Sequence, residues 1–152
     1  MTGTADELTD PHSITAETEF TVEFYDVDSM EVVWHGNYVK YFEKARCALL
    51  NKIGYGYEAM KESGFAFPVT GIDLKFIRPL RFGERVRARA LLDEYENRLR
   101  IKYELYNAAT GELTTRGTST QMAVDMAKRE SCFESPRILL DRVRALLREG
   151  GR

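Results

Sequence analysis

The chain has 152 residues, of which 43% are hydrophobic and 30% are charged. This composition is typical of a single folded domain and excludes a largely disordered or membrane-embedded chain. The 22 basic and 24 acidic side chains give a formal net charge of -2, which excludes a general positive field for binding nucleic acid. The two cysteines, Cys47 and Cys132, have neither a disulfide framework nor metal-ligand spacing, so no metal site is expected.

The N-terminal segment is polar and lacks the periodicity that would attach it to a core. We therefore predict a disordered tail over residues 1–15, followed by one domain over residues 16–150. The first residues include acidic side chains and no apolar run, which predicts neither a signal peptide nor a membrane anchor. The expected location is the cytoplasm, with no insertion into a membrane.

A strand and a long helix are expected next. Alternating apolar and polar residues over 17–25 predict a half-buried strand. Over residues 38–53 the apolar side chains recur at steps of three and four, which predicts a helix laid against a sheet. Asn37 is the expected N-cap and Gly54 the expected stop. A short second helix is expected over residues 57–63.

The pattern then changes to alternation, which predicts a block of antiparallel strands. Four strands are expected, over residues 67–77, 84–92, 99–105 and 113–126. Ser135 and Pro136 predict the start of a C-terminal helix, as an N-cap and a proline at the first helical position. The order of strand, helix, strands and helix predicts an α+β fold.

Ionisable side chains crowd the connector between the first strand and the long helix. Asp26, Asp28 and His35 lie there, and the last two flank the apolar stretch Val32-Val33-Trp34. A carboxylate that is partly desolvated by such a stretch could act as a base or a nucleophile near neutral pH. The connector is therefore the candidate site of chemistry.

Four groups of residues in and after this connector form a specific pattern. They are Asp26-Val27-Asp28, Val32-Val33-Trp34-His35, Asn37-Tyr38 and Tyr41-Phe42-Glu43-Lys44-Ala45-Arg46. In these groups and their spacing the sequence resembles the 4-hydroxybenzoyl-CoA thioesterase family and its relative, the acyl-CoA thioesterase of the Tol-Pal gene cluster. Phe67-Pro68-Val69 and Arg78-Pro79-Leu80 fall where that family has its second strand and a turn. The resemblance extends over residues 18–135.

The resemblance implies a hotdog fold, in which a long central helix is wrapped by a curved antiparallel β-sheet, here with a C-terminal helix added. It implies hydrolysis of an acyl thioester to a free acid and a thiol, with acyl-CoA or an acyl-carrier protein as the substrate. It also implies a homodimer or homotetramer whose active sites lie between subunits. No cofactor is expected, because coenzyme A is part of the substrate.

The resemblance also implies roles for particular residues. Asp28 is the expected catalytic carboxylate, which either directs a water molecule at the carbonyl carbon or attacks that carbon itself. The backbone N–H of His35 is the expected donor to the thioester oxygen, and a direct role for its imidazole stays open. A helix N-terminus suits this purpose, because it presents unpaired N–H groups and a partial positive charge. The expected substrate contacts are Tyr25, Glu31, Trp34 and Tyr38.

Two other functional classes remain open from the sequence. Glu31 stands where the resembled family usually has glycine, and this bulkier residue favours a protein that binds acyl groups without hydrolysing them. A hotdog dehydratase is the other class. Asp28 and His35 have the opposite chain order from the one expected for a dehydratase.

Several residues near the motif keep two interpretations each. Asp26 is expected to be structural, as a cap of the loop or as the partner of a basic residue. Trp34 and Tyr38 line the acyl pocket or fill a subunit interface. A row of arginines on one face of the expected strand 84–92 is a solvated face or a contact for coenzyme A phosphates. The row comprises Arg85, Arg87 and Arg89.

Overall fold

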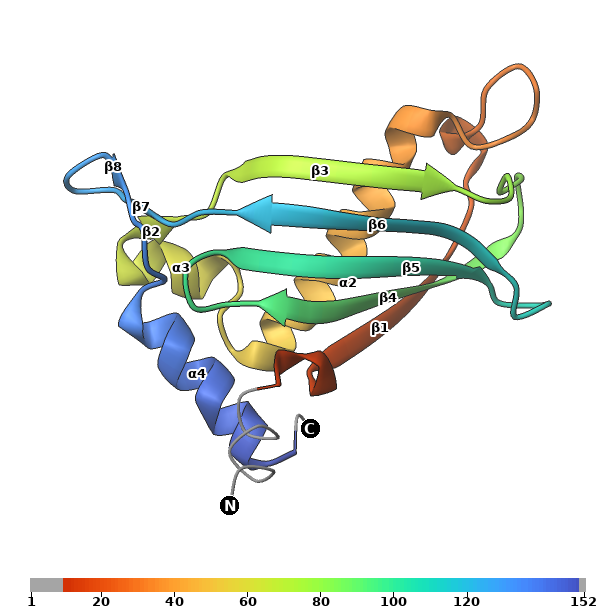
Figure 1. The fold of residues 1–152 in the computed structure, drawn as a ribbon. Helices are drawn as coiled ribbons and strands as arrows, with labels where there is room; N and C mark the ends of the chain where they lie inside the picture. The colour runs from red at the N-terminus through yellow and green to blue at the C-terminus, as the bar shows by residue number, and fades with distance from the viewer. Residues whose placement is uncertain (1–9, 151–152) are drawn as a thin grey trace.

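A five-stranded antiparallel sheet forms most of the computed structural model, which describes residues 10–150. Its strands are β1 (Thr15–Thr21), β3 (Val69–Phe76), β4 (Arg85–Glu94), β5 (Leu99–Asn107) and β6 (Leu113–Gln121). They are arranged in the order β1-β4-β5-β6-β3, and every neighbouring pair is antiparallel (Figure 1). β3 is therefore one edge of the sheet and β1 is the other.

Helices and three short strands complete the fold. The helices are η1 (Pro11–Ser13), η2 (Phe24–Asp26), η3 (His35–Asn37), α2 (Tyr38–Ile53), α3 (Tyr57–Ser63) and α4 (Arg137–Arg148). The short strands β2 (Phe65–Ala66), β7 (Val124–Asp125) and β8 (Glu130–Ser131) form a small second sheet. None of the helices within the described range has the length and apolar character needed to cross a membrane.

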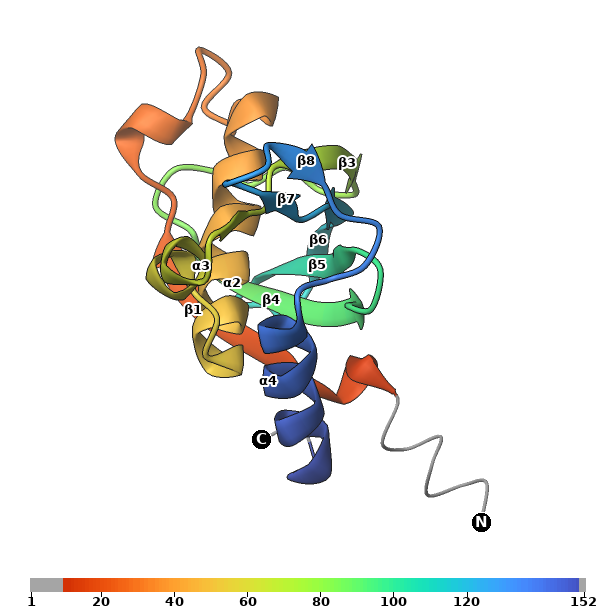
Figure 2. The ribbon, with the colours of Figure 1, turned by 90° about the vertical axis from the view of Figure 1, so that its left-hand side faces the viewer.

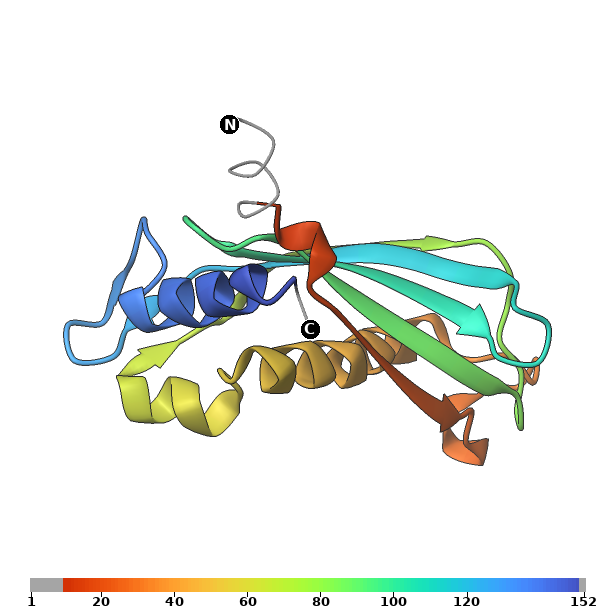
Figure 3. The ribbon, with the colours of Figure 1, turned by 90° about the horizontal axis from the view of Figure 1, so that it is seen from below.

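The core lies between α2 and the inner face of the sheet, which is the face that α2 covers (Figure 3). Alternate residues of β4 point into it and are fully buried, as the period of two requires. They are Val86, Ala88, Ala90 and Leu92. Above β5 and β6, the Phe42 ring of α2 stacks on Tyr103 with a centroid distance of 4.5 Å and an interplanar angle of 7°. Burying a side chain such as Phe42 contributes about 1.5–3 kcal/mol.

The two ends of the molecule are built differently. α4 closes one end, where Leu139, Val143 and Leu147 pack into the core and the helix contacts η1 and α2 (Figure 2). The Arg142 guanidinium donates to the Gly54 carbonyl at 3.1 Å, next to the C-terminus of α2. The connector from β1 to α2 lies at the opposite end. This connector contains the ionisable residues Asp26, Asp28 and His35.

The arginine row of β4 lies on the outer face of the sheet, which is the face opposite α2. Each guanidinium is paired with a carboxylate of a neighbouring strand at 3.0–3.1 Å. The pairs are Arg85–Glu19, Arg87–Glu17 and Arg89–Glu104. Because its charges are matched within the sheet, this row fits the solvated face better than a phosphate contact.

The expected architecture is confirmed in most elements. The long helix covers residues 38–53 and ends at Gly54, whose φ of 82° gives the left-handed C-terminal stop. The short helix over residues 57–63 is also present. The three expected strands that begin near residues 84, 99 and 113 correspond to β4, β5 and β6. The α+β class with antiparallel strands is confirmed as well.

The expected first strand and N-terminal tail are corrected at their limits. β1 ends at Thr21, because its partner β4 begins at Arg85 opposite it, and Phe24 then lies in η2 with 76% of its surface exposed. Residues 10–15, expected in the tail, form η1 and the start of β1, and Ile14 is fully buried. The rest of the expected tail, residues 1–9, lies outside the described residues.

Three later limits are also corrected. The expected strand over residues 67–77 is shorter in the structure: β3 begins at Val69, directly after Pro68, which lacks the N–H that a ladder needs, and ends at Phe76. The expected strand over residues 113–126 is divided after Gln121 into β6 and β7, which belong to different sheets. α4 begins with Pro136 as its N-cap, and the hydroxyl of Ser135 is buried without capping the helix.

Candidate active site

Asp28 lies in a tight turn between two short paired segments. Val27 and Val33 form an antiparallel bridge, and inside it the Asp28 N–H donates to the Val32 carbonyl at 2.9 Å. The Glu31 N–H donates back to the Asp28 carbonyl at 3.0 Å, and Glu31 has a φ of 64°. This is the pattern of a three-residue hairpin loop that ends on a left-handed residue. The left-handed conformation explains why glycine suits the position that Glu31 occupies.

The Asp28 side chain is exposed in the single chain. Its Oδ1 atom accepts the Met30 N–H at 2.8 Å, which fixes the carboxylate against its own turn. Within residues 10–150, no protein group donates to its Oδ2 atom. One carboxylate oxygen is thus held in place while the other is free to accept a proton or to attack a substrate.

The helix that follows offers unpaired donors. Trp34 is the N-cap of η3, and the Trp34 N–H donates to the Asp26 carbonyl at 3.0 Å. The next two N–H groups, those of His35 and Gly36, donate no hydrogen bond within the described part of the chain. η3 continues directly into α2, whose dipole adds a partial positive charge at this end. The N–H groups of His35 and Gly36 could therefore stabilise an oxyanion.

Trp34 lies over the first turn of this helix. A Cβ atom on Gly36 would be 2.2 Å from the Trp34 ring, so only glycine lets the indole take this position. The ring is 5.0 Å from the His35 ring and half of it stays exposed. Trp34 therefore forms an apolar surface beside the free N–H groups.

The other expected substrate contacts differ in exposure. Tyr25 is 79% exposed, whereas only 3% of Tyr38 is exposed and its hydroxyl oxygen accepts the Leu80 N–H at 3.3 Å. Burial raises the pKa of Tyr38 and keeps its hydroxyl protonated. The ring of Tyr38 also meets Phe76 edge-on at 4.9 Å, so Tyr38 is a core residue of this chain beside the β3 edge.

Several contacts near the turn were not expected from the sequence. Phe82 meets Phe24 edge-on at 6.2 Å, and 58% of its surface is exposed. The Asn37 amide donates to the Asp26 carbonyl, and the Tyr41 hydroxyl donates to the Asp26 carboxylate. The three-residue step from Tyr38 to Tyr41 signals a shared helix face, but not this contact.

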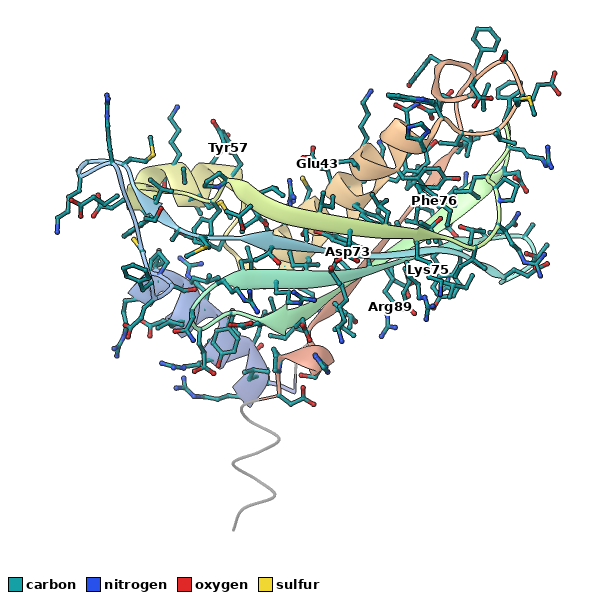
Figure 4. The ribbon with its side chains drawn as sticks, turned by 45° about the horizontal axis from the view of Figure 1, so that its top comes forward. Glu43, Tyr57, Asp73, Lys75, Phe76 and Arg89 are labelled. Carbon is teal, nitrogen blue, oxygen red and sulfur yellow. The ribbon has the colours of Figure 1, made fainter. Side chains whose placement is uncertain are left out.

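The outer face of the sheet has an open hollow of about 440 Å³. Asp73, Lys75 and Arg89 line it, and none of its lining residues belongs to the connector that holds Asp28 (Figure 4). Because this hollow does not reach the connector, the connector stays the candidate site of chemistry.

No cluster of potential metal ligands occurs in residues 10–150. Cys47 and Cys132 are free thiols, one exposed and the other partly buried. The connector supplies the Asp28 carboxylate and the unpaired main-chain N–H groups of His35 and Gly36. This set suits attack on a carbonyl carbon and stabilisation of its oxygen.

Comparison with known proteins identifies the family of this chain. The family described as the thioesterase-like superfamily matches residues 22–143. The protein named "Putative acyl-CoA thioesterase YneP" from Bacillus subtilis is 32% identical over 111 residues, which cover 72% of this chain and 80% of that protein.

Solved structures agree in fold. A DHNA-CoA thioesterase from Staphylococcus aureus matches with a TM-score of 0.75 and 28% identity, over 90% of this chain and 95% of that one. A hypothetical protein from Thermus thermophilus matches with a TM-score of 0.77 and 30% identity, over 86% of this chain and 98% of that one. The expected resemblance is thus confirmed, and the chain belongs to the thioesterase-like superfamily with the hotdog fold.

Proposed function

We propose that this thioesterase hydrolyses acyl-CoA to a free acid and coenzyme A, with Asp28 as its catalytic carboxylate. One observation supports this proposal. The turn that holds Asp28 is hydrogen-bonded to Val32 and Val33, which lie just before the unpaired N–H groups of His35 and Gly36. The names of the Bacillus and Staphylococcus relatives support acyl-CoA as the substrate class. The cytoplasmic location expected from the sequence is part of this proposal.

Two routes use the same groups. In one, a water oxygen attacks the thioester carbonyl carbon, Asp28 takes a proton from that water, and the C–S bond breaks. In the other, Asp28 attacks the carbon, expels the thiolate and forms an anhydride that water then hydrolyses. In both, negative charge develops on the carbonyl oxygen, where the N–H groups of His35 and Gly36 donate. A thiol with a pKa of about 8.5 leaves as a thiolate without a strong general acid.

The test is thiol release measured with a thiol-reporting dye. Aliphatic and aromatic acyl-CoAs and an acyl-carrier protein thioester are offered to the wild type, to Asp28→Asn and to Asp141→Asn. Asp28→Asn is expected to lower kcat at least about 100-fold, because the amide can neither accept a proton nor attack. Asp141 lies exposed on α4 and pairs only with Arg137 within the described residues, so Asp141→Asn is the matched loss of charge and should leave kcat unchanged.

The panel also separates the alternatives. Thiol release from the acyl-carrier protein thioester but from no acyl-CoA would show that the substrate is the carrier-protein thioester and not acyl-CoA. Equal release by the wild type and Asp28→Asn would contradict the role of Asp28. A wild type that binds the substrates and releases no thiol from any of them would contradict hydrolysis and favour a binding protein.

We further propose that two copies of the chain pair along β3. This edge strand has eight residues, of which seven are exposed, and it carries the apolar side chains Val69, Ile72 and Phe76. A long exposed edge with apolar side chains is an aggregation hazard unless another strand covers it. A second copy would cover the edge and would lie beside Tyr38 and the start of α2.

The side chains of β3 favour one register for this pairing. Antiparallel pairing centred on Leu74 would place Asp73 opposite Lys75 of the partner subunit, and Ile72 opposite Phe76 of the partner subunit. Asp73 and Lys75 share the outer face of β3 (Figure 4), where opposite charges attract, and Ile72 and Phe76 are both apolar. By symmetry each pair would occur twice.

A charge swap tests both the dimer and its register. Lys75→Asp places like charges opposite each other twice and should raise the dimer dissociation constant about tenfold, equivalent to about 1.4 kcal/mol. Asp73→Lys combined with Lys75→Asp should restore it. Analytical ultracentrifugation measures both. A wild type that stays monomeric would contradict the dimer. A double variant with a dimer dissociation constant as high as that of Lys75→Asp would contradict this register.

A further inference from the structure

Asp26 is a buried carboxylate without a cationic partner. Its residue surface is 7% exposed, and no Lys, Arg or His nitrogen of the described chain lies within 4 Å of it. Burying a charge in this way is costly unless hydrogen bonds compensate it. Two donors do so: the Tyr41 hydroxyl and the Glu23 N–H each reach Oδ2 at 2.9 Å.

The Tyr41 hydroxyl is held in its donating form. Burial and the neighbouring Asp26 carboxylate both raise the pKa of Tyr41 far above its usual value. The Tyr41 ring is 2% exposed and is packed between Phe20 at 4.6 Å and Tyr38 at 5.8 Å. The donor is therefore fixed in position by the packing of α2.

The main chain of Asp26 is attached to the same helix start. Its carbonyl accepts the Trp34 N–H at 3.0 Å and the Asn37 amide at 2.8 Å. Trp34 directly precedes His35, and Asp28 lies two residues after Asp26. One residue thus joins the Asp28 turn to the N–H groups proposed to hold the substrate oxygen.

We propose that Asp26 is a positioning residue for catalysis, which acts through Tyr41 and the Glu23 N–H to hold Asp28 beside the N–H groups of His35 and Gly36. This inference rests on the proposed thioester hydrolysis. A displacement of about 1 Å can lower a rate by about a hundredfold when the reacting groups depend on alignment. Loss of the anchor therefore lowers kcat more than it changes substrate binding.

The test compares kcat and KM for acyl-CoA among variants, with values normalised to folded enzyme. Asp26→Ala is expected to lower kcat at least about tenfold with little change in KM. Asp26→Asn should recover most of kcat, because both donors reach a single oxygen that an amide also provides. Tyr41→Phe should lower kcat, and the double variant Asp26→Ala with Tyr41→Phe should be no worse than Asp26→Ala alone.

Tyr55→Phe is the matched control for Tyr41→Phe. Tyr55 is a fully buried tyrosine just beyond the other end of α2, and its hydroxyl shares a hydrogen bond of 2.7 Å with Ser63. Its loss should lower stability without lowering kcat. A kcat loss as large as that of Tyr41→Phe would contradict a specific role of the Asp26 anchor.

Amide hydrogen exchange supplies a readout that does not depend on turnover. Asp26→Ala should speed exchange in residues 27–36 while β4 and β5 stay protected. Unchanged exchange and unchanged kcat would overturn the inference, as would equal kcat losses in Asp26→Asn and Asp26→Ala. A wild type without thioesterase activity would overturn the proposed function instead, and the inference with it. If Asp26→Ala does not fold, Tyr41→Phe and Asp26→Asn still decide the question by kcat and exchange.

Discussion

Glu31 has a backbone conformation that is unfavourable for a residue with a Cβ atom. Its φ of 64° lies in the left-handed region, where a Cβ atom costs about 1–2 kcal/mol relative to a right-handed conformation. The turn needs this conformation because two hydrogen bonds close it. The Glu31 N–H donates to the Asp28 carbonyl, and the Asp28 N–H donates to the Val32 carbonyl. Glu31 therefore carries strain close to Asp28, the proposed catalytic carboxylate, and such strain is often retained at functional sites.

Glu31→Gly is expected to raise the free energy of unfolding by about 0.5–1 kcal/mol, because relief of the backbone strain exceeds the extra entropy that glycine gives the unfolded chain. Urea denaturation measures this change. Glu31→Ala keeps the Cβ atom and should bring no such gain. An equal gain in both variants would show that the carboxylate, not the backbone, is the source of the strain.

Gly36 has the opposite role, because it provides space rather than a special φ. Gly36→Ala should displace the Trp34 ring from the helix start, since the new Cβ atom would lie 2.2 Å from it. If Trp34 contacts the substrate, KM for acyl-CoA should rise about tenfold, the effect of a lost contact of about 1.4 kcal/mol. Steady-state kinetics in a Trp34→Ala background provide the control, where Gly36→Ala should have little further effect.

At the scale of elements, the close approach of α2 to the sheet decides where the connector lies. β4 presents alanines to the helix, and β6 presents Gly117 beneath the Phe42 ring. A Cβ atom on Gly117 would be 2.4 Å from both the Phe42 ring and the Asp73 carbonyl. The helix axis is therefore set by small residues below it, and the N-terminus of α2 is held near the Asp28 turn as a result.

Gly117→Ala should destabilise the fold by about 1–3 kcal/mol, the usual range for an overpacked core. Chemical denaturation followed by circular dichroism measures this loss. Thr120→Ala changes an outward-facing residue of the same strand and should cost clearly less. Similar losses in the two variants would contradict the tight contact between Phe42 and Gly117.

For the whole molecule, an ion cluster ties the N-terminal turn to the sheet. Asp93 of β4 meets His12 of η1 at 2.6 Å, Arg100 at 3.1 Å and Lys102 at 3.5 Å. Partial burial alone would raise the pKa of Asp93, but hydrogen bonds and positive charge from His12 and Lys102 outweigh it and lower the pKa below 3.8. Ionised Asp93 thus helps to attach η1 to strands β4 and β5.

A carboxyl group with a lowered folded-state pKa stabilises the fold above its unfolded pKa and loses this effect as the pH falls. The unfolding free energy should therefore decrease on acidification below about pH 4, the usual range for aspartate. Asp93→Asn should be less stable than the wild type at pH 7 and should depend less on pH below 4. Thermal unfolding at several pH values measures both, and parallel curves for the two proteins would contradict the role of Asp93.

Elements with a local pattern could be predicted from the amino-acid sequence. The period of Tyr38 to Ile53 and the glycine at 54 predicted α2, and the alternation around Val86 and Leu99 predicted β4 and β5. Four groups of residues between Asp26 and Arg46 also indicated the thioesterase family, which the comparisons confirm. Helix and strand periodicities are properties of neighbouring residues, so they can be recognised before the fold is known.

Contacts between residues distant in the chain could not be predicted in this way and are known from the folded structure. The end of β1 at Thr21 depends on where β4 begins, and the break after Gln121 arises because β6 and β7 belong to different sheets. The bond between Asp26 and Tyr41 joins residues 15 positions apart. Such contacts follow from the packing of α2 on the sheet and leave no local period in the sequence, because partners distant in the chain are chosen by the shared core.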